Sequence, residues 1–338
     1  MPTLTTQQVE AWKPEVSNFI NEELDQTPKT AYGQISSEFI TTRLQEIDIT
    51  TSGPAPMQPV GEDGNAIEVA SQQGYTTFYN KANYRQKETF SSNLWKTDQH
   101  DVIERMAKDF ASNFRYSRDL WFFSQHRRGW DSTFLWGDGQ PLIDLGHPRK
   151  DGGTAQPNTF RDGVQLPLDY ASALVGQDVM LSAVSDTGNL LSVADPGVNK
   201  VLLVGPQNRN NAFQLAGVNA SDYEPDSAEN NANYFRKGDT FDVLVTKYIS
   251  WEAATLMGET SVAKTSSSNF YDSMWFIIDV PLAKRVNKMY VQEGYAYSSD
   301  DVNFDNEALL FYLYDMYAFG NSSWLPTFGS KGDHSTVT

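Results

Sequence analysis

The segment from Thr97 to Arg128 constrains the fold more than any other part of the chain. Its apolar residues recur three, four or about seven positions apart, as on one face of a helix. Thr97 is a suitable N-cap, acidic residues follow it in the first turn, and Gly129 can end the helix. The apolar positions are Val102, Ile103, Met106, Phe110, Phe114 and Trp121.

One helix over residues 97–128 would be roughly 45 Å long at the α-helical rise per residue. This length is unusual for a globular domain of ordinary shape. A coiled coil would also contain a long helix, but the apolar spacing is not a sustained heptad. The sequence therefore predicts a subunit built along one rigid helix.

The segments that precede this helix are weakly self-sufficient. From Pro14 onward, Val16, Phe19, Ile20 and Leu24 fall at helical spacing. A short isolated helix is marginal in water, so this arm needs a partner surface on its own domain or on a neighbour.

A loop rich in proline and glycine follows at 51–65, and the chain then reads as extended from Ile67 to Phe90. The aromatic residues Tyr75 and Tyr79 alternate with polar ones there. We expect a polar two-stranded arm, which is marginal alone and normally lies against another surface.

The rest of the chain alternates between short helices and strands. The turn-rich middle is followed by a predicted helix at 167–181, a buried strand at 200–204 and a helix at 211–216. Residues 219–240 read as an exposed loop, strands are predicted at 241–248 and 274–280, and residues 290–317 alternate as in a final sheet.

Composition excludes several classes of protein. The chain has 338 residues, 39% of them hydrophobic, which is enough to form a core. It has no cysteine, so disulfides and thiolate metal or redox sites are excluded. We expect a soluble intracellular chain, because no signal peptide or membrane-spanning apolar stretch is evident. A net charge of −17 argues against a protein that grips nucleic acid, although it permits a container for it.

The sequence contains no recognisable catalytic or metal-binding motif. Its four histidines are scattered, and neither a nucleophile elbow nor a phosphate-binding loop is present. Asp226, Asn230 and Asn231 lack the spacing and the closing glutamate of a calcium loop. A glycoside hydrolase needs two carboxylates at a defined separation, and 43 acidic residues offer pairs without specificity. We therefore predict no catalytic residue, cofactor or metal.

Several short motifs follow one another in order after Gly74. A polar extended arm ends at residues 90–94 and leads into the long helix. The later motifs are Asp138-Gly139-Gln140-Pro141-Leu142, Gly146-His147-Pro148, Gly152-Gly153-Thr154 with Asn158, Lys200–Pro206 with Ala212, Trp275-Phe276-Ile277-Ile278, Tyr317-Ala318-Phe319-Gly320, Trp324, and Gly329-Ser330-Lys331-Gly332. This order resembles the major capsid proteins of tailed bacteriophages, specifically the Mu-like head-subunit group within the HK-ninety-seven fold.

The resemblance covers about three quarters of the chain and implies an α+β fold of the HK-ninety-seven type. Its parts would be an N-terminal arm at 1–50, an extended loop at 51–96, a peripheral domain at 97–199 with its spine helix at 97–128, an axial domain at 200–305, and a C-terminal return at 306–338. The contacts between subunits that it suggests are those of Phe19, Leu24, Tyr75, Tyr79, Tyr84, Arg85, Lys87 and Phe90.

The implied function is self-assembly into pentamers and hexamers of an icosahedral shell around double-stranded DNA, without sequence-specific binding or a membrane. The chain would be assembled in the host cytoplasm and reside in the virion. Its partners would be further copies of itself, a portal, and possible scaffolding, maturation-protease or decoration proteins. Two alternatives stay open at this point: another phage structural protein such as a tail-tube subunit, and a carbohydrate-active enzyme.

Overall fold

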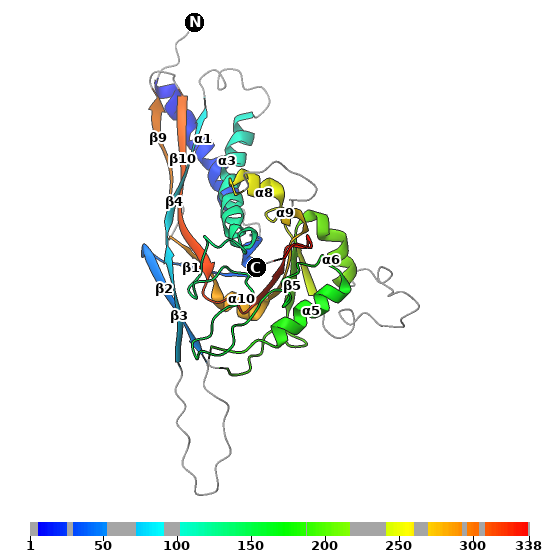
Figure 1. Ribbon diagram of the computed structural model, residues 1–338. Coiled ribbons are helices and arrows are strands. Elements are labelled where there is room, and N and C mark those ends of the chain that lie inside the picture. Colours follow the sequence, from blue (N-terminus) through cyan, green and yellow to red (C-terminus); the bar gives the residue numbers. More distant parts are fainter. Residues whose placement is uncertain are drawn as a thin grey trace.

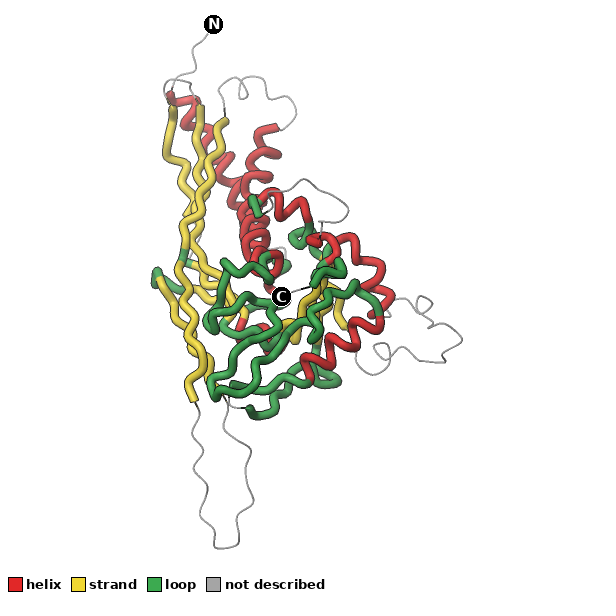
Figure 2. Tube along the Cα trace, viewed as in Figure 1, coloured by secondary structure: helices red, strands yellow, loops and turns green. Residues whose placement is uncertain are grey.

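The computed structural model describes residues 6–25, 30–52, 72–90, 102–186, 188–216, 241–259, 270–292, 296–303 and 308–336. Within these ranges the strands form a five-stranded, a four-stranded and a two-stranded sheet. Figure 1 shows long strands along one side of the molecule and a second, helix-flanked sheet on the other. Irregular segments lie between these two parts (Figure 2).

The five-stranded sheet is organised around β10 (Ala308–Asn321). One edge of β10 pairs antiparallel with β4 (Ala82–Phe90), and its other edge is shared by β9 (Ala296–Asn303) and β8 (Asn287–Val291). The strand β1 (Ser37–Ile40) adds in parallel to β8. The sheet therefore joins strands from both ends of the chain.

Two long helices pack on the part of this sheet that β4 and β10 form. The arm helix α1 (Thr6–Asp25) contacts the spine helix α3 (Val102–Phe122), and both cover the face of β4 and β10 that carries Phe90 and Phe311. The α1 helix has no basic residue in its last turn. Instead, the guanidinium of Arg115 in α3 donates to the carbonyls of Glu23 and Leu24, which satisfies the end of α1. The arm thus finds its partner surface on its own chain.

The two-stranded sheet is a hairpin of β2 (Gln45–Ser52) and β3 (Gln72–Asn80). Since β3 leads through Lys81 directly into β4, the hairpin continues the line of the long sheet and projects beyond it (Figure 1).

The four-stranded sheet has the order β11 (Thr327–Ser330), β7 (Trp275–Asp279), β5 (Lys200–Val204) and β6 (Phe241–Val245). Apolar residues of α5 and α6 pack on one of its faces. The α5 helix begins with a capping box between Asp169 and Ser172. The helices of this half are α5 (Tyr170–Leu181), α6 (Arg209–Ala216), α8 (Trp251–Leu256), α9 (Phe270–Ser273) and α10 (Val280–Val286). A short 3₁₀ turn at Pro206–Asn208 follows β5, and another at Tyr32–Gln34 follows the arm helix.

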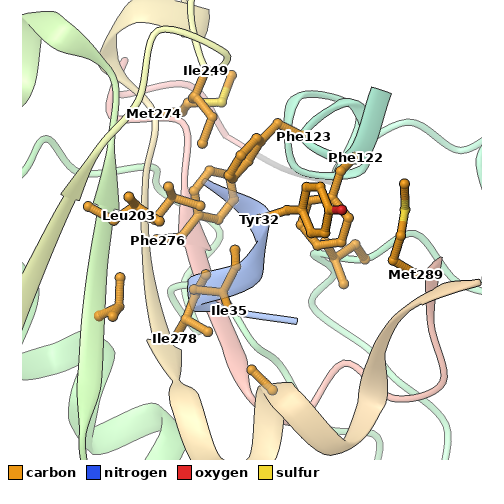
Figure 3. Close-up of a cluster of buried hydrophobic side chains, with 14 of the residues drawn as sticks. Tyr32, Ile35, Phe122, Phe123, Leu203, Ile249, Met274, Phe276, Ile278 and Met289 are labelled. Carbon is orange, nitrogen blue, oxygen red and sulfur yellow. The ribbon is translucent and has the colours of Figure 1, made fainter. Parts of the chain in front are cut away.

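A central core joins the two halves. Figure 3 shows Tyr32 and Ile35, from the segment after the arm, between aromatic residues at the end of the spine helix and the second sheet. The rings of Tyr32 and Phe122 lie 5.4 Å apart, and Phe122 meets Phe123 edge to face at 5.5 Å. Because one core serves both sheets, we expect the chain to fold as one cooperative body.

Many of the elements expected from the sequence are confirmed. These are the arm helix, the helices near 167–181 and 211–216, the strands at 200–204, near 241–248 and near 274–280, and the final sheet. The predicted loops at 51–65 and 219–240 lie almost wholly, or wholly, outside the described residues.

Three expectations were wrong in detail. Pro14 lies inside α1, which begins at Thr6, rather than at the start of the helix. The spine helix is α3, about 31 Å long by the α-helical rise; the chain turns at Phe123 and continues as the short helix α4 (Ser124–Arg127), and residues 97–101 lie outside the described residues. Residues 67–90 do not form a hairpin of their own, because β3 pairs with β2 and β4 pairs with β10.

Candidate assembly surfaces

The inner face of the β2–β3 hairpin is fastened to the body of the subunit. The ammonium of Lys288 in β8 lies 2.6 Å from a carboxylate oxygen of Asp48, and both side chains are mostly buried. Tyr79 is buried with its ring against Tyr290, 5.0 Å between centroids. The hydroxyl of Tyr75 donates to the carbonyl oxygen of Pro148 at 3.0 Å. The hairpin is therefore held at its base by polar and aromatic contacts.

The outer face of the hairpin is apolar and exposed. The register places Ile47 opposite Phe78 and Ile49 opposite Thr76. The exposed fractions of Ile47, Ile49 and Phe78 are 54%, 46% and 58%. The apolar residues Phe39, Ile40 and Leu44, in β1 and just before β2, are exposed as well. We call Ile47, Ile49 and Phe78 the hairpin stripe. Contiguous exposed apolar side chains of this kind mark interaction surfaces.

The outer face of the long sheet is of a different kind. Arg85 and Lys87 of β4 are exposed there, opposite Tyr314 and Tyr312 of β10. The guanidinium of Arg85 lies 5.3 Å from the centroid of the Tyr314 ring. This face combines cations and tyrosines, which suits polar contacts better than burial in a core.

The eight residues suggested by the resemblance do not form one surface. Tyr79, Phe90 and Leu24 are buried within their own chain, and Tyr84 is half-buried and stacks on Tyr317 with 4.0 Å between ring centroids. Phe19 and Tyr75 are half-buried, while Arg85 and Lys87 are exposed. A side chain buried in its own chain leaves little area for a neighbour. Contacts of these residues with another subunit stay a prediction.

Sequence reasoning missed the hairpin stripe. Ile47 and Ile49 alternate with Glu46, Asp48 and Thr50, which is a strand signal. The alternation in β3 drew attention to Tyr75 and Tyr79, whose shared face points inward. Phe78 lies on the opposite, outer face, where Ile47 of the neighbouring strand β2 is paired with it.

In the middle segment, a buried histidine, His147, holds two loops together by hydrogen bonds and ring stacking. The buried ring of His147 lies between Asp138 (Nδ1–Oδ2 2.7 Å) and Asn158 (Nε2–Oδ1 3.2 Å) and stacks on Trp324 at 4.5 Å. The Asn158 amide nitrogen donates to the carbonyls of Leu142 and Thr327, so its oxygen accepts from His147 Nε2. The His147 Nδ1 nitrogen lies within hydrogen-bond distance of the Asp138 carboxylate. This cluster ties the loop at 138–158 to the approach of β11.

A second buried histidine behaves differently. His126 is fully buried among Phe122, Phe123 and Phe276, and neither ring nitrogen has a hydrogen-bond partner in the part of the chain that the structure describes. Burial, and then the adjacent Arg127, lowers the pKa of His126 to about 3, so the ring is neutral. It serves as a core side chain.

No group of three metal-ligating side chains occurs in the part of the chain that the structure describes. Among the same residues, every helix is too short or too polar to cross a bilayer.

Comparison with known proteins gives a likeness in structure. No protein-family model matches the chain, and no curated protein matches it. The capsid of the cyanophage P-SCSP1u aligns with 88% of this chain and 86% of its own at a TM-score of 0.51 and 11% identity. The capsid of an empty GTA particle aligns with 89% of both chains at 0.50 and 12%. The fold is that of a phage capsid subunit.

The α+β capsid fold expected from the order of motifs is thereby confirmed. The capsid of the native GTA particle aligns equally well, at a TM-score of 0.50 and 11% identity over 89% of this chain. At such identities the likeness concerns the fold.

Proposed function

We propose that the chain is a major capsid protein, which assembles into pentamers and hexamers of an icosahedral phage shell around double-stranded DNA. In this role it is a structural protein of the virion and not an enzyme. The capsid fold supports the proposal, and the hairpin stripe carries it. A projecting arm whose inner face is fastened and whose outer face is apolar has its remaining apolar area directed away from its own core.

The small size of the β2–β3 hairpin fits an assembly that is held together by many weak contacts. One short hairpin buries little area, but in a closed shell every copy both offers a hairpin and receives one. Many weak contacts made together then give a stable shell, because linked binding events gain from effective concentration. The acidic net charge of −17 works against association at long range, so we expect assembly to be favoured by added salt, which screens that repulsion.

The test is assembly of a variant in which Ile47, Ile49 and Phe78 are all replaced by threonine. Threonine keeps the strand propensity and removes most of the apolar area. We expect a folded subunit with an unchanged circular dichroism spectrum, and no shells by size exclusion and negative-stain electron microscopy. The matched control replaces Val175 of α5 and Leu256 of α8 by alanine; their exposed fractions of 45% and 62% are comparable, they lie away from the hairpin, and this variant should assemble normally.

Two results would contradict the proposal. A wild-type chain that stays monomeric at all concentrations would exclude a shell protein. Normal shells from the triple variant would show that the hairpin stripe plays no part in assembly.

A further inference from the structure

A cationic hollow lies where the end of the spine helix meets the α8–α9 region and the C-terminal strand. Its volume is about 470 Å³. The residues that matter for its chemistry are Arg127, Arg128, Trp130, Glu259, Phe270 and Lys331. Three cations from distant parts of the sequence thus line one cavity in a chain that is acidic overall.

Two of the three cations already have anionic partners. Arg127 is buried and forms a double hydrogen bond with Glu259, Nε–Oε2 at 2.7 Å and Nη2–Oε1 at 2.8 Å. Arg128 lies 2.9 Å from a carboxylate oxygen of Asp131. These pairs are complete as they stand, so they need no further ligand.

Lys331 is the cation that forms no direct ion pair with a described residue. Its ammonium lies 5.3 Å from the centroid of the Phe270 ring and 5.7 Å from that of Trp130. No ion pair or hydrogen bond reaches the ammonium from any residue in the described ranges. The side chain is half-buried, and burial lowers the pKa of Lys331, although the charge of Asp333 acts in the opposite direction. Two rings stabilise an ammonium by a modest amount, which does not replace a carboxylate.

The position of Lys331 is fixed by its backbone. Its N–H donates to the side-chain oxygen of Gln165 at 3.1 Å, and its carbonyl accepts from the Ser273 hydroxyl at 2.7 Å. The carboxylate of Asp333 attracts the ammonium through space, but it accepts from the N–H and the hydroxyl of Ser335 and forms no direct ion pair with Lys331. The same wall also holds the indole N–H of Trp130, which is buried and has no acceptor among the residues described.

A half-buried ammonium that is held in place and forms no direct ion pair with any described residue can receive an anion from outside.

We propose that this hollow, which we call the Lys331 site, receives a carboxylate side chain of a second copy of the chain. The inference rests on the proposed function, since it assumes that copies meet in a shell. With 43 acidic and 26 basic residues in each copy, carboxylates are the most abundant anions on any neighbouring subunit. Like-charged copies need local points of attraction, and such points also set which surfaces meet.

A carboxylate fits this site better than a DNA phosphate does. Duplex DNA presents its phosphates on a convex rod and is bound by exposed lysines and arginines. The Lys331 ammonium lies recessed between two rings, where one flexible side chain can enter and a duplex cannot. Aromatic walls also exclude water from the contact, which strengthens it.

Zero-length cross-linking of assembled wild-type protein tests the contact directly. A carbodiimide joins an amine to a carboxylate that touches it. Shells assembled from an equal mixture of ¹⁴N and ¹⁵N chains should yield, by mass spectrometry, a mixed-isotope peptide that joins Lys331 to an aspartate or glutamate. Shells in which Lys331 stays unlinked, or is linked only within one chain, would overturn the inference.

Three variants test how much the contact at Lys331 contributes to assembly. Lys331→Met should raise the subunit concentration needed for assembly at least roughly tenfold, as expected on removing one partner of a desolvated charge pair. Lys331→Arg should restore most of the loss. Lys284→Met, at an exposed lysine in α10, should change nothing.

The outcomes separate the two proposals. An unchanged assembly threshold for Lys331→Met refutes the Lys331 site alone, as would empty shells that form normally and fail only when they contain DNA, which would point to phosphate. Wild-type protein that never assembles refutes the proposed function and this inference together. If Lys331→Met does not fold, the cross-link in the wild-type shell still decides.

Discussion

Removal of one carboxylate, by Glu259→Gln, should strongly destabilise the subunit, because the Glu259 side chain is 8% exposed and pairs with a fully buried arginine. Arg127 is fully buried, and its guanidinium is held by Glu259 together with the carbonyl oxygens of Leu120 and Tyr248. The pair fastens the end of the spine helix to the α8–α9 region. Glutamine keeps the shape of the side chain and one acceptor, so the change isolates the charge.

The size of the effect follows from burial. Breaking a buried ion pair on one side leaves an uncompensated charge and costs about 3–5 kcal/mol. Domains are stable by about 5–15 kcal/mol, so the variant should lose a large part of its stability. In urea this corresponds to a fall in the unfolding midpoint on the order of 1 M, given slopes of about 1–3 kcal/mol per molar.

The assay is urea unfolding of unassembled subunits, followed by tryptophan fluorescence, with the double variant Arg127→Met/Glu259→Leu as control. Replacing both partners with apolar side chains removes the stranded charge, so the double variant should be clearly more stable than Glu259→Gln. It should lose mainly the hydrogen bonds to the two carbonyls, about 1 kcal/mol each. A Glu259→Gln midpoint close to that of wild type would mean that Arg127 reaches solvent, and the reasoning would be refuted.

Three further outcomes are expected. Burial lowers the pKa of His126 below its ordinary value of 6.5, to about 3, so the unfolded chain binds one more proton than the folded chain in this window. Stability should therefore fall as the pH drops from 6.5 toward 3, by up to about 1.4 kcal/mol per unit from this group, and urea titrations of His126→Phe should show a shallower fall; equal slopes would contradict this. Gly320→Ala places a Cβ 2.7 Å from Trp136 and 2.9 Å from Tyr79, so unfolding should become easier by about 1–3 kcal/mol, and an unchanged midpoint would exclude this close packing. Asp48→Asn removes the partner of Lys288, so amide hydrogen exchange should accelerate in β2 and β3 and stay unchanged in β7, whereas slow exchange throughout would show that the ion pair does not hold the hairpin.

Local patterns predicted elements better than their partners. The alternation of β3 and the helical spacing around Phe110 were visible, because period two and period 3.6 are properties of the chain itself. Which strand lies beside β4 is not such a property. Its partner β10 lies at the other end of the sequence, and the polar residues of β4 fit a free arm as well as they fit this sheet.

The face of a strand poses the same problem. Alternation separates residues into two sets but does not say which set points inward. Tyr75 and Tyr79 lie on the inner face, the side on which Asp48 pairs with Lys288, whereas Phe78 lies on the exposed outer face. The end of the spine helix was equally hidden, since Trp121, Phe122 and Phe123 are all aromatic and only tertiary packing decides where the turn occurs.

The Lys331 site could not be predicted from local sequence patterns, for a related reason. Its cations and rings come from residues near 127–131, 270 and 331, and each alone resembles an ordinary surface charge or core aromatic. The motif that contains Lys331 contributed to the resemblance, whereas the position of its ammonium between two rings, without a direct ion pair to a described residue, became visible only in three dimensions.

The parallel pairing of β1 with β8 also means that the five-stranded sheet cannot form until most of the chain has been synthesised. The Asn287 amide, at the start of β8, donates to the Ile35 carbonyl 252 positions earlier, and β10 follows later still. At about 5–20 residues per second of synthesis, β1 and β4 wait many seconds for their partners. Until β10 has left the ribosome, the hairpin has no finished base from which to project. In the proposed function, only chains that have been synthesised through β10 would present a hairpin on a finished base, so chains that end before β10 would not enter the shell.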